Sequence, residues 1–215
     1  MTQRATHRTA GIVLAAGRGT RFGGGKMLAP IDGLPMLQHV LNVAADAGLD
    51  PIVVVLGNDA EQIGAAIKWR NELRVRNDHP KRGISGSVKV GLESISESDR
   101  ALILLGDQPL LTPDQIRTII SPDHDSTRPI AVPRYSDGRL GSPVLLERGA
   151  WALAAGLTGD RGMSQLFDSH ADQIRYVELP GDNPDIDTRA DLAAVSRGGE
   201  PGRSGHTEAA GRRKP

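Results

Sequence analysis

The stretch Gly11-Ile-Val-Leu-Ala-Ala-Gly-Arg-Gly-Thr-Arg-Phe-Gly-Gly-Gly-Lys26 decides the fold, because it joins a short apolar run to a loop that holds five glycines. The run at residues 12–15 is typical of a strand that is buried on both faces. Glycines at this density let backbone N–H groups turn toward one point, so a phosphate site is expected at the end of this strand. Arg18, Arg21 and Lys26 add positive charge. A merely flexible surface loop is the alternative.

Two standard phosphate-binding motifs fail on this loop. A dinucleotide-binding fingerprint needs a third Gly or Ala where Phe22 stands. A P-loop needs Gly where Thr20 stands and Ser or Thr where Met27 stands. The sequence therefore disfavours both dinucleotide binding and ATP hydrolysis of the P-loop type.

Beyond this loop, short apolar runs alternate with amphipathic stretches, which predicts an α/β domain with a largely parallel sheet. Further strands are expected at residues 52–56, 73–76, 101–105, 129–132, 143–146 and 174–178. Helices are expected at residues 34–44, with Gly48 after the helix end, from Asp59 onward, from Thr112 to Ile120, and from Thr188 to about Val195. We expect a flexible N-terminus at residues 1–9, one domain at residues 10–195, and a disordered tail at residues 196–215, where Gly, Pro, Ser and charged residues prevail.

Composition excludes several classes of function. The 215 residues carry 26 basic and 26 acidic side chains, so the chain offers no global basic surface for nucleic acid. No apolar run is long enough to cross a bilayer. The chain has no cysteine, which rules out disulfides, thiolate nucleophiles and zinc-thiolate sites, and a cytoplasmic location fits best. The six histidines are scattered and form no metal-binding pair.

Two acidic positions are candidate metal ligands. Asp107 follows the apolar run at residues 101–105, and open α/β sheets bind ligands at the carboxyl ends of their strands. A carboxylate there suits Mg²⁺, although an aspartate before Pro109 is also a common turn residue. Asp187 precedes the expected helix cap Thr188, where an acidic side chain also favours the helix dipole.

Taken in order, these motifs resemble a known family. The pattern Leu14-Ala-Ala-Gly-x-Gly-x-Arg-Phe-Gly-x-x-Lys26 is followed by Gly106-Asp107-x-Pro-Leu and by Asp185-x-Asp187-Thr-x-x-Asp191-Leu. Together they resemble the MobA-like nucleotidyltransferases of molybdenum-cofactor synthesis, most closely the CTP:molybdopterin cytidylyltransferase branch. The resemblance implies a single-domain Rossmann-like fold of the nucleotide-diphospho-sugar transferase type, a three-layer sandwich around a mostly parallel mixed sheet.

The resemblance also implies a set of site residues. Lys26 would face the triphosphate as a catalytic group, Asp107 would hold Mg²⁺ and act in catalysis, and Asp187 would be a second metal ligand. Asp185 and Asp191 are expected to be structural. The nucleotide would be bound by Leu14, Ala15, Ala16, Gly17, Arg18, Gly19, Arg21, Lys26, Asn77, Gly83 and Ser85. The acceptor side would hold Ser142, Gly159, Asp160 and Arg161.

The same resemblance implies the reaction. The terminal phosphate of an acceptor would attack the α-phosphate of a nucleoside triphosphate, and pyrophosphate would leave. Leu14-Ala-Ala-Gly17 favours CTP, because the GTP-using branch usually shows Leu-Ala-Gly-Gly. The expected acceptor is molybdopterin, with molybdoenzymes of the xanthine dehydrogenase type as downstream partners. A GTP-dependent guanylyltransferase, a sugar-phosphate nucleotidyltransferase and a non-catalytic delivery protein remain as alternatives.

Three departures from the family pattern concern specificity. Ile84 and Gly86 interrupt the serine-rich segment of residues 83–87 that would contact the nucleotide. Ser142 stands where the family usually has His or Asn before Pro143. Because serine is smaller, a long-reach contact to the acceptor would be missing.

Overall fold

A seven-stranded sheet forms the centre of the computed structural model, which describes residues 8–17, 19–79, 83–121, 127–159 and 162–198. The strands are β1 (Thr9–Ala15), β4 (Ile52–Leu56), β5 (Leu73–Arg76), β6 (Arg100–Leu105), β7 (Ile130–Tyr135), β8 (Val144–Glu147) and β9 (Ile174–Leu179). Their order across the sheet is β5-β4-β1-β6-β8-β7-β9. Strand β8 runs antiparallel to β6 and β7, and the other neighbours are parallel. The expected α/β class with a mostly parallel mixed sheet is confirmed.

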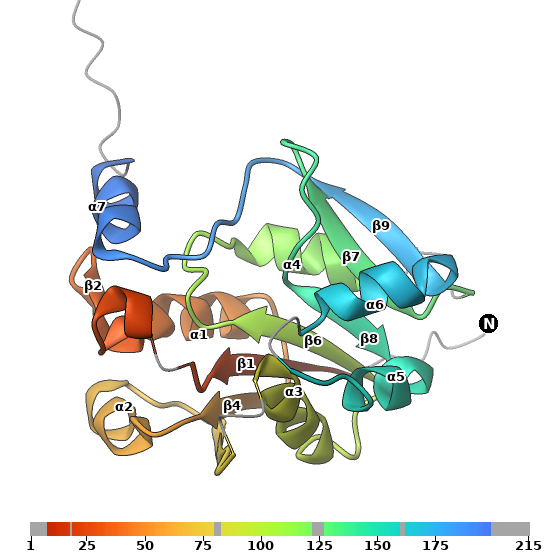
Figure 1. Cartoon of the computed structure of the whole chain (residues 1–215), viewed down its shortest axis with the longest axis horizontal. Coiled ribbons are helices and arrows are strands. Elements are labelled where there is room, and N and C mark those ends of the chain that lie inside the picture. The colour runs from red at the N-terminus through yellow and green to blue at the C-terminus, as the bar shows by residue number, and fades with distance from the viewer. Residues whose placement is uncertain (1–7, 18, 80–82, 122–126, 160–161, 199–215) are drawn as a thin grey trace, which may run out of the picture.

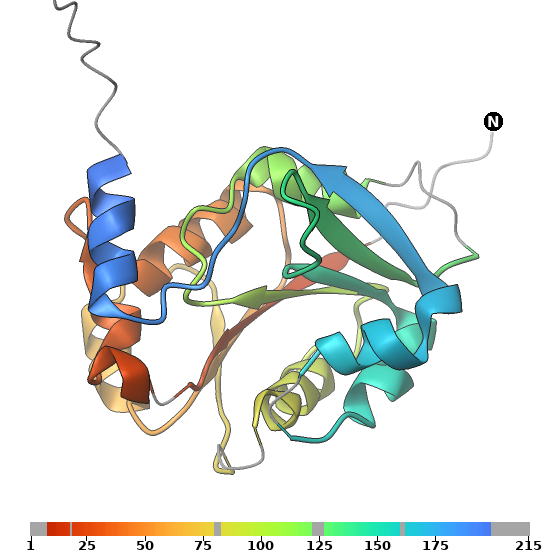
Figure 2. The same cartoon turned by 45° about the horizontal axis from the view of Figure 1, so that its top comes forward.

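Helices cover both faces of the sheet and make it the middle of three layers (Figures 1 and 2). One face packs against α1 (Met36–Asp46), α2 (Ala60–Ala66) and α4 (Pro113–Ile120). The other face packs against α3 (Ile84–Glu93), α5 (Trp151–Ala155) and α6 (Ser164–Ser169). Successive side chains of a strand point to opposite faces, so the apolar runs supply two hydrophobic cores from the same strands.

Helix α3 lies unusually close to the central strand. A Cβ atom on Gly91 of α3 would come within 2.4 Å of a methyl group of Ile12, a side chain with no solvent exposure. Only glycine therefore permits this approach. At the amino end of α3, Ile84 lines one pocket together with Leu14 of β1 and Leu105 of β6, at the edge where open α/β sheets bind ligands.

The last helix packs beside the first loop rather than on the sheet. Helix α7 (Arg189–Gly198) lies against the hairpin of β2 (Pro30–Ile31) and β3 (Leu34–Pro35), as Figure 1 shows. Phe22, Met36 and Ile186 form the buried centre of this contact, with Leu192 packed against it. The chain thereby brings residues near 20 and near 190 into one small core.

Most predicted boundaries hold within a few residues, and β1 and α7 extend slightly beyond the expected limits of residues 10–195. Thr9, expected in the flexible N-terminus, is the first residue of β1, because it pairs with Arg100 and its carbonyl accepts a hydrogen bond from the N–H of Asp50 at 3.0 Å. Helix α7 continues past Val195 to Gly198. The rest of the predicted tail and residues 1–7 lie outside the described part of the chain.

Four short 3₁₀ turns and one small hairpin complete the described structure. The turns are η1 (Thr20–Phe22), η2 (Lys26–Leu28), η4 (Arg148–Ala150) and η5 (Ala171–Gln173). Within the described ranges, no helix combines the length and the apolar character that a membrane crossing needs.

Candidate active site

The glycine-rich loop is folded by its own backbone. Gly19 and Gly25 both adopt left-handed conformations, with φ of 54° and 64°, and stand directly before η1 and η2. The carbonyl of Gly19 accepts hydrogen bonds from the N–H groups of Phe22, Gly23 and Gly24 at 3.0, 3.1 and 3.2 Å. A Cβ atom on Gly19 would also lie 3.1 Å from Cβ of Lys26. Glycine at position 19 therefore allows the left-handed turn and leaves room for the side chain of Lys26.

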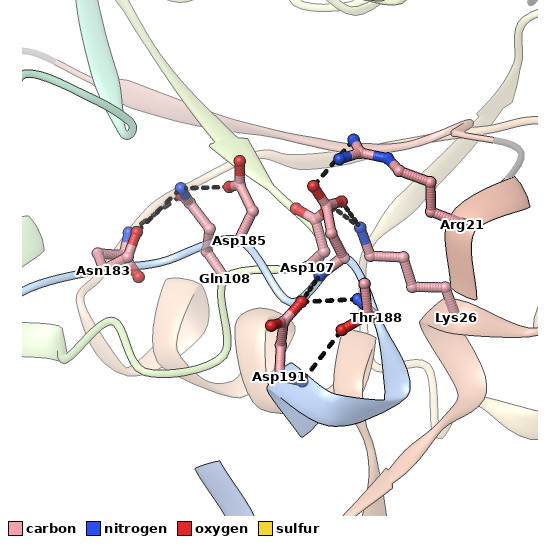
Figure 3. A network of polar contacts seen from close by, with 9 residues as sticks. Arg21, Lys26, Asp107, Gln108, Asn183, Asp185, Thr188 and Asp191 are labelled. Carbon is pink, nitrogen blue, oxygen red and sulfur yellow. Dashed lines mark hydrogen bonds and ion pairs between the residues drawn. The ribbon is translucent and has the colours of Figure 1, made fainter. Parts of the chain in front are cut away.

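Lys26, Asp107 and Asp187 form one ionic cluster, here called the charged centre (Figure 3). The Lys26 Nζ atom lies 2.5 Å from Oδ2 of Asp107 and 2.8 Å from Oδ1 of Asp187. Arg21 binds the other oxygen of Asp187 at 2.9 Å. These residues come from the first loop, the end of β6 and the start of α7. The structure thus brings together three residues that the sequence analysis singled out.

The charged centre keeps Lys26 protonated. Burial by itself would lower the pKa of this lysine, since the side chain is only 9% exposed. The charges and hydrogen bonds of Asp107, followed by those of Asp187, outweigh burial and raise the pKa above its usual value. At neutral pH, Lys26 is therefore a cation that faces the carboxylates of Asp107 and Asp187 in a partly buried site.

Asp187 is positioned by the backbone on both of its sides. The preceding N–H of Ile186 donates to the carbonyl of Asp107 at 3.1 Å, which ties the two acidic segments together. On the other side, Asp191 accepts hydrogen bonds from the N–H groups of Asp187 and Thr188 at 3.1 and 2.7 Å. The N–H of Asp191 donates in return to the Thr188 hydroxyl at 3.2 Å. This reciprocal cap begins α7, lowers the pKa of Asp191 and gives that residue a structural task.

The two carboxylates of the charged centre fit a divalent cation. One ammonium contacts both Asp107 and Asp187, so a single metal ion of similar position would reach an oxygen of each. Within the described residues, no group of three or more His, Cys, Asp or Glu side chains is placed to hold a metal. Mg²⁺ usually takes one or two protein carboxylates and completes its shell with water and phosphate oxygens. The carboxylates of Asp107 and Asp187 match this coordination preference of Mg²⁺.

The residues predicted to bind the nucleotide gather at the same edge of the sheet. Leu14 and Ala15 end β1, and the following residues lead into the loop. Gly83 precedes α3, and Ser85 in its first turn donates to the carbonyl of Gly159 at 3.1 Å. Arg18 lies outside the described residues.

Asn77 is placed differently from a simple ligand-binding group. It is buried, and its side-chain Nδ2 donates to the Ser87 hydroxyl at 3.0 Å while its Oδ1 accepts from the N–H of His79 at 2.9 Å. Its own N–H donates to the carbonyl of Leu56 at 2.9 Å. Asn77 therefore joins the ends of β4 and β5 to α3 and shapes this wall of the site through its backbone and side-chain bonds.

Beside the charged centre lies a cavity of about 320 Å³, here called the acceptor pocket. Its walls come from β1, β6, β7, β8, the connection between β7 and β8, α3, α6 and the segment before α7. They include Leu14, Ile84, Ile103, Leu105, Gln108, Tyr135, Arg139, Leu140, Gly141, Ser142, Val144, Gly162, Met163, Ser164, Phe167, Asn183, Pro184 and Asp185. Ser142, which was predicted on the acceptor side, lines this cavity. Gly159 lies next to α3, whereas Asp160 and Arg161 lie outside the described residues.

A polar network on one wall of the acceptor pocket was missed by the sequence analysis. Gln108 donates to Oδ1 of Asp185 at 2.9 Å and accepts from Nδ2 of Asn183 at 3.0 Å (Figure 3). Nδ2 of Asn183 also donates to the carbonyl of Ser142 at 3.2 Å, and this carbonyl accepts from the Tyr135 hydroxyl at 2.7 Å. Gln108 could have been found from the sequence, because it lies inside the Gly-Asp-x-Pro motif. Asn183 and Tyr135 belong to no motif that would have indicated them.

Burial governs the ionisation of the two acidic members of this wall. Desolvation raises the pKa of Tyr135 to about 12, so its hydroxyl stays a donor. Desolvation, followed by the negative charge of Asp107, raises the pKa of Asp185 above its usual value, and the hydrogen bond from Gln108 opposes that rise. Asp185 was expected to be structural, and in the structure its side chain lines the pocket.

Comparisons with known proteins agree with this geometry. Residues 11–174 match the family model described as MobA-like NTP transferase domain. Rv0371c from Mycobacterium tuberculosis H37Rv is 31% identical, with a TM-score of 0.79 over 89% of this chain and 98% of that one. A further structure of Rv0371c, a complex with manganese, gives a TM-score of 0.77 at 31% identity over 88% of this chain and 98% of that one.

More distant matches extend the likeness of the fold. A nucleotidyl transferase from Methanothermobacter, Mth528, has a TM-score of 0.75 at 23% identity and covers 89% of this chain and 97% of that one. The bifunctional protein GlmU of Halorhodospira halophila is 34% identical over 119 residues, which are 52% of this chain and 24% of GlmU. The chain thus spans about a quarter of the length of the curated relatives it matches.

Proposed function

The chain belongs to the family of MobA-like NTP transferase domains, and we propose that it transfers CMP from CTP to the phosphate of molybdopterin, free or molybdenum-loaded. An oxygen of the acceptor phosphate forms a bond to the α-phosphorus of CTP. The bond from this phosphorus to the oxygen that bridges to the β-phosphate breaks, and pyrophosphate leaves with that oxygen. The product is the cytosine dinucleotide form of the cofactor, and no covalent enzyme intermediate is needed.

The observation that carries this proposal is the position of Lys26 between Asp107 and Asp187, at the border of the acceptor pocket. Phosphoryl and nucleotidyl transfer depend on neutralising and positioning charge more than on covalent chemistry. Lys26 would stabilise the negative charge that develops on the triphosphate. The folded loop around Gly19 would hold the nucleotide, and the pocket would place the attacking phosphate.

Mg²⁺ is the metal that we propose for this site, with Asp107 and Asp187 as its ligands. When bound, a divalent cation neutralises charge on the triphosphate and lowers the barrier to displacement. The manganese complex of Rv0371c supports the use of a divalent cation in this branch of the family. Lys26 would then exchange its carboxylate partners for phosphate oxygens.

The choice of CTP rests on the resemblance of Leu14-Ala-Ala-Gly17 to the cytidylyltransferase branch. A molybdopterin acceptor would make enzymes of the xanthine dehydrogenase type the downstream partners. The apolar side chains of Ile103, Leu105 and Val144 support an acceptor with a flat ring, because such a ring has apolar faces. A GTP-dependent reaction and a sugar-phosphate acceptor are outcomes that the experiment separates.

The test is pyrophosphate release by the full chain with Mg²⁺ and CTP, GTP, ATP or UTP in turn, each with and without molybdenum-loaded molybdopterin and with a sugar 1-phosphate as a second acceptor. We expect pyrophosphate release only when CTP and molybdopterin are both present, and not with any other pair of nucleotide and acceptor. Release with GTP or with the sugar phosphate would replace the nucleotide or the acceptor. Binding of CTP without release under any condition would favour a delivery protein.

A further inference from the structure

The acceptor pocket has a markedly uneven distribution of charge. Of its described lining residues, only Arg139 and Asp185 carry charged side chains, and the others are apolar or neutral. Arg139 is bound by Asp137 on the exposed connection between β7 and β8. Asp185 lies next to the charged centre on the segment before α7. Asp185 is therefore the one carboxylate among the described residues that line this mainly apolar cavity.

Asp185 differs from its neighbour Asp187 in what it contacts. Asp187 forms ion pairs with Lys26 and Arg21. Asp185 instead accepts a hydrogen bond from Gln108 (Figure 3). The carboxylates of Asp107, Asp185 and Asp187 do not converge as one group of metal ligands within the described residues. Asp185 therefore differs from Asp107 and Asp187 in lining the acceptor pocket.

Gln108 fixes the orientation of Asp185. Its side chain is 6% exposed, its Oε1 accepts from Nδ2 of Asn183, and its Nε2 donates to the Asn183 carbonyl at 3.3 Å. These contacts settle which end of the Gln108 amide is the donor, so its Nε2 must face Oδ1 of Asp185. Oδ2 of Asp185, an oxygen of an exposed side chain, is left for a ligand.

We propose that Asp185, held by Gln108, determines acceptor specificity by accepting a hydrogen bond from an N–H group on the ring of the acceptor. A carboxylate accepts strong, charge-assisted hydrogen bonds from N–H donors. The apolar walls formed by Leu14, Ile103 and Val144 suit the faces of a flat ring, whose polar edge then meets Asp185. This inference rests on the proposed transfer to a pterin-bearing acceptor and adds the contact that selects it.

Three full-length variants test the assignment. Asp185→Asn keeps the shape of the side chain and removes its charge, and Gln108→Glu removes the donor and places a second carboxylate beside Asp185. Asp182→Asn is the matched control, because Asp182 is exposed on the same segment and does not line the pocket. The first readout is the KM for molybdopterin and for CTP in pyrophosphate release.

The expected result is a selective loss of acceptor binding. We expect Asp185→Asn and Gln108→Glu each to raise the KM for molybdopterin by roughly ten- to a hundredfold, the usual range for a hydrogen bond to a charged group. The KM for CTP should stay within about twofold, and Asp182→Asn should behave like the wild type. Because both variants act through one contact, the double variant should lose little more than either single variant.

A second readout separates this inference from the proposed function. Binding of unphosphorylated 2-amino-4-oxopteridine, followed by its own fluorescence, requires no turnover. If the wild type binds this pteridine and Asp185→Asn does not, the specificity contact stands even where no pyrophosphate is released. Equal pteridine binding by the wild type and Asp185→Asn, or no binding by either, overturns the inference. A parallel rise in the KM for CTP would also overturn it, because it would place Asp185 in the nucleotide site.

Discussion

The charged centre and the acceptor pocket lie side by side but are built in opposite ways. The charged centre uses three ionic side chains, each next to a strand end, a glycine turn or a helix cap. The acceptor pocket draws on many elements, and most of its walls are apolar. The first region is specified by residue type at fixed points, and the second by the shape that several elements enclose. We therefore expect single substitutions to have larger effects in the charged centre than in the acceptor pocket.

The largest effect is expected from removing a metal ligand in the charged centre. Asp107→Asn should lower kcat for pyrophosphate release by at least about a hundredfold, because divalent cations contribute several kcal/mol to such displacements. The fold should survive, since Lys26 keeps its ion pair with Asp187. Circular dichroism and thermal unfolding check the fold. Near-normal turnover in this variant would remove Asp107 from the metal site.

Lys26 offers a sharper test of the same region, because activity and metal affinity should change in opposite directions. Lys26→Met should lower kcat by about a hundredfold or more, since a preorganised charge opposite the triphosphate is lost. Free Mn²⁺, measured without nucleotide by electron paramagnetic resonance, should bind more tightly, because the ammonium no longer neutralises Asp107 and Asp187. Exposed Lys89→Met is the control. Weaker Mn²⁺ binding by Lys26→Met would contradict this account.

In the acceptor pocket, an added side chain should have a moderate and selective effect. Ser142→Asn restores a longer polar group at a position that lines the cavity. We expect the KM for molybdopterin to fall by about two- to tenfold, as for one net hydrogen bond, with the KM for CTP unchanged. Steady-state kinetics with each substrate varied in turn will measure both values. An equal change in the two constants would show that the regions are not independent.

The smallest effect concerns stability near the nucleotide side, where Asp59 precedes α2. Burial raises the pKa of this carboxyl above its usual value, although a backbone hydrogen bond opposes the rise. The folded state then binds the proton more tightly than the unfolded state, so the stability gained from protonation is complete below the unfolded pKa of about 3.9 and is lost as the pH rises through the folded pKa.

Asp59→Asn should therefore shift the urea midpoint upward at pH 7.5, because it removes a partly buried charge. The difference from the wild type should shrink as the pH approaches 4. Urea unfolding at both pH values, followed by tryptophan fluorescence, measures this shift. A destabilised variant at pH 7.5 would indicate that the charged carboxylate makes a favourable contact.

The comparison of the two regions also explains what the sequence could reveal. Lys26, Asp107 and Asp187 were predicted because ionic chemistry needs particular residue types at strand ends and caps, and short motifs record such positions. Tyr135, Arg139 and Asn183 were not predicted, since their place in a pocket depends on how distant segments pack. The hydrogen bonds of Asn77 to Ser87 and His79 were not predicted either, because a buried amide can satisfy its hydrogen bonds within the fold.

The same distinction applies to the fold. The buried strands and the capped helix α4 have strong local signals, and their predicted limits lie within a few residues of the structure. The hairpin of β2 and β3 was missed, because two-residue strands leave no periodic pattern. Its turn needs left-handed conformations at Asp32 and Gly33, with φ of 49° and 81°. Helices α5 and α6 are too short for a clear apolar stripe.

The docking of α7 completes the charged centre from residues that lie far apart in the sequence. Lys26 must meet Asp107 and Asp187 across sequence separations of 81 and 161 residues. Contacts so distant along the chain close large loops and form late in folding. A nascent chain that has completed the central strands still has one carboxylate missing from its ionic cluster. The proposed metal pair therefore depends on the packing of α7 against the first loop, because this packing brings Asp187 to Lys26.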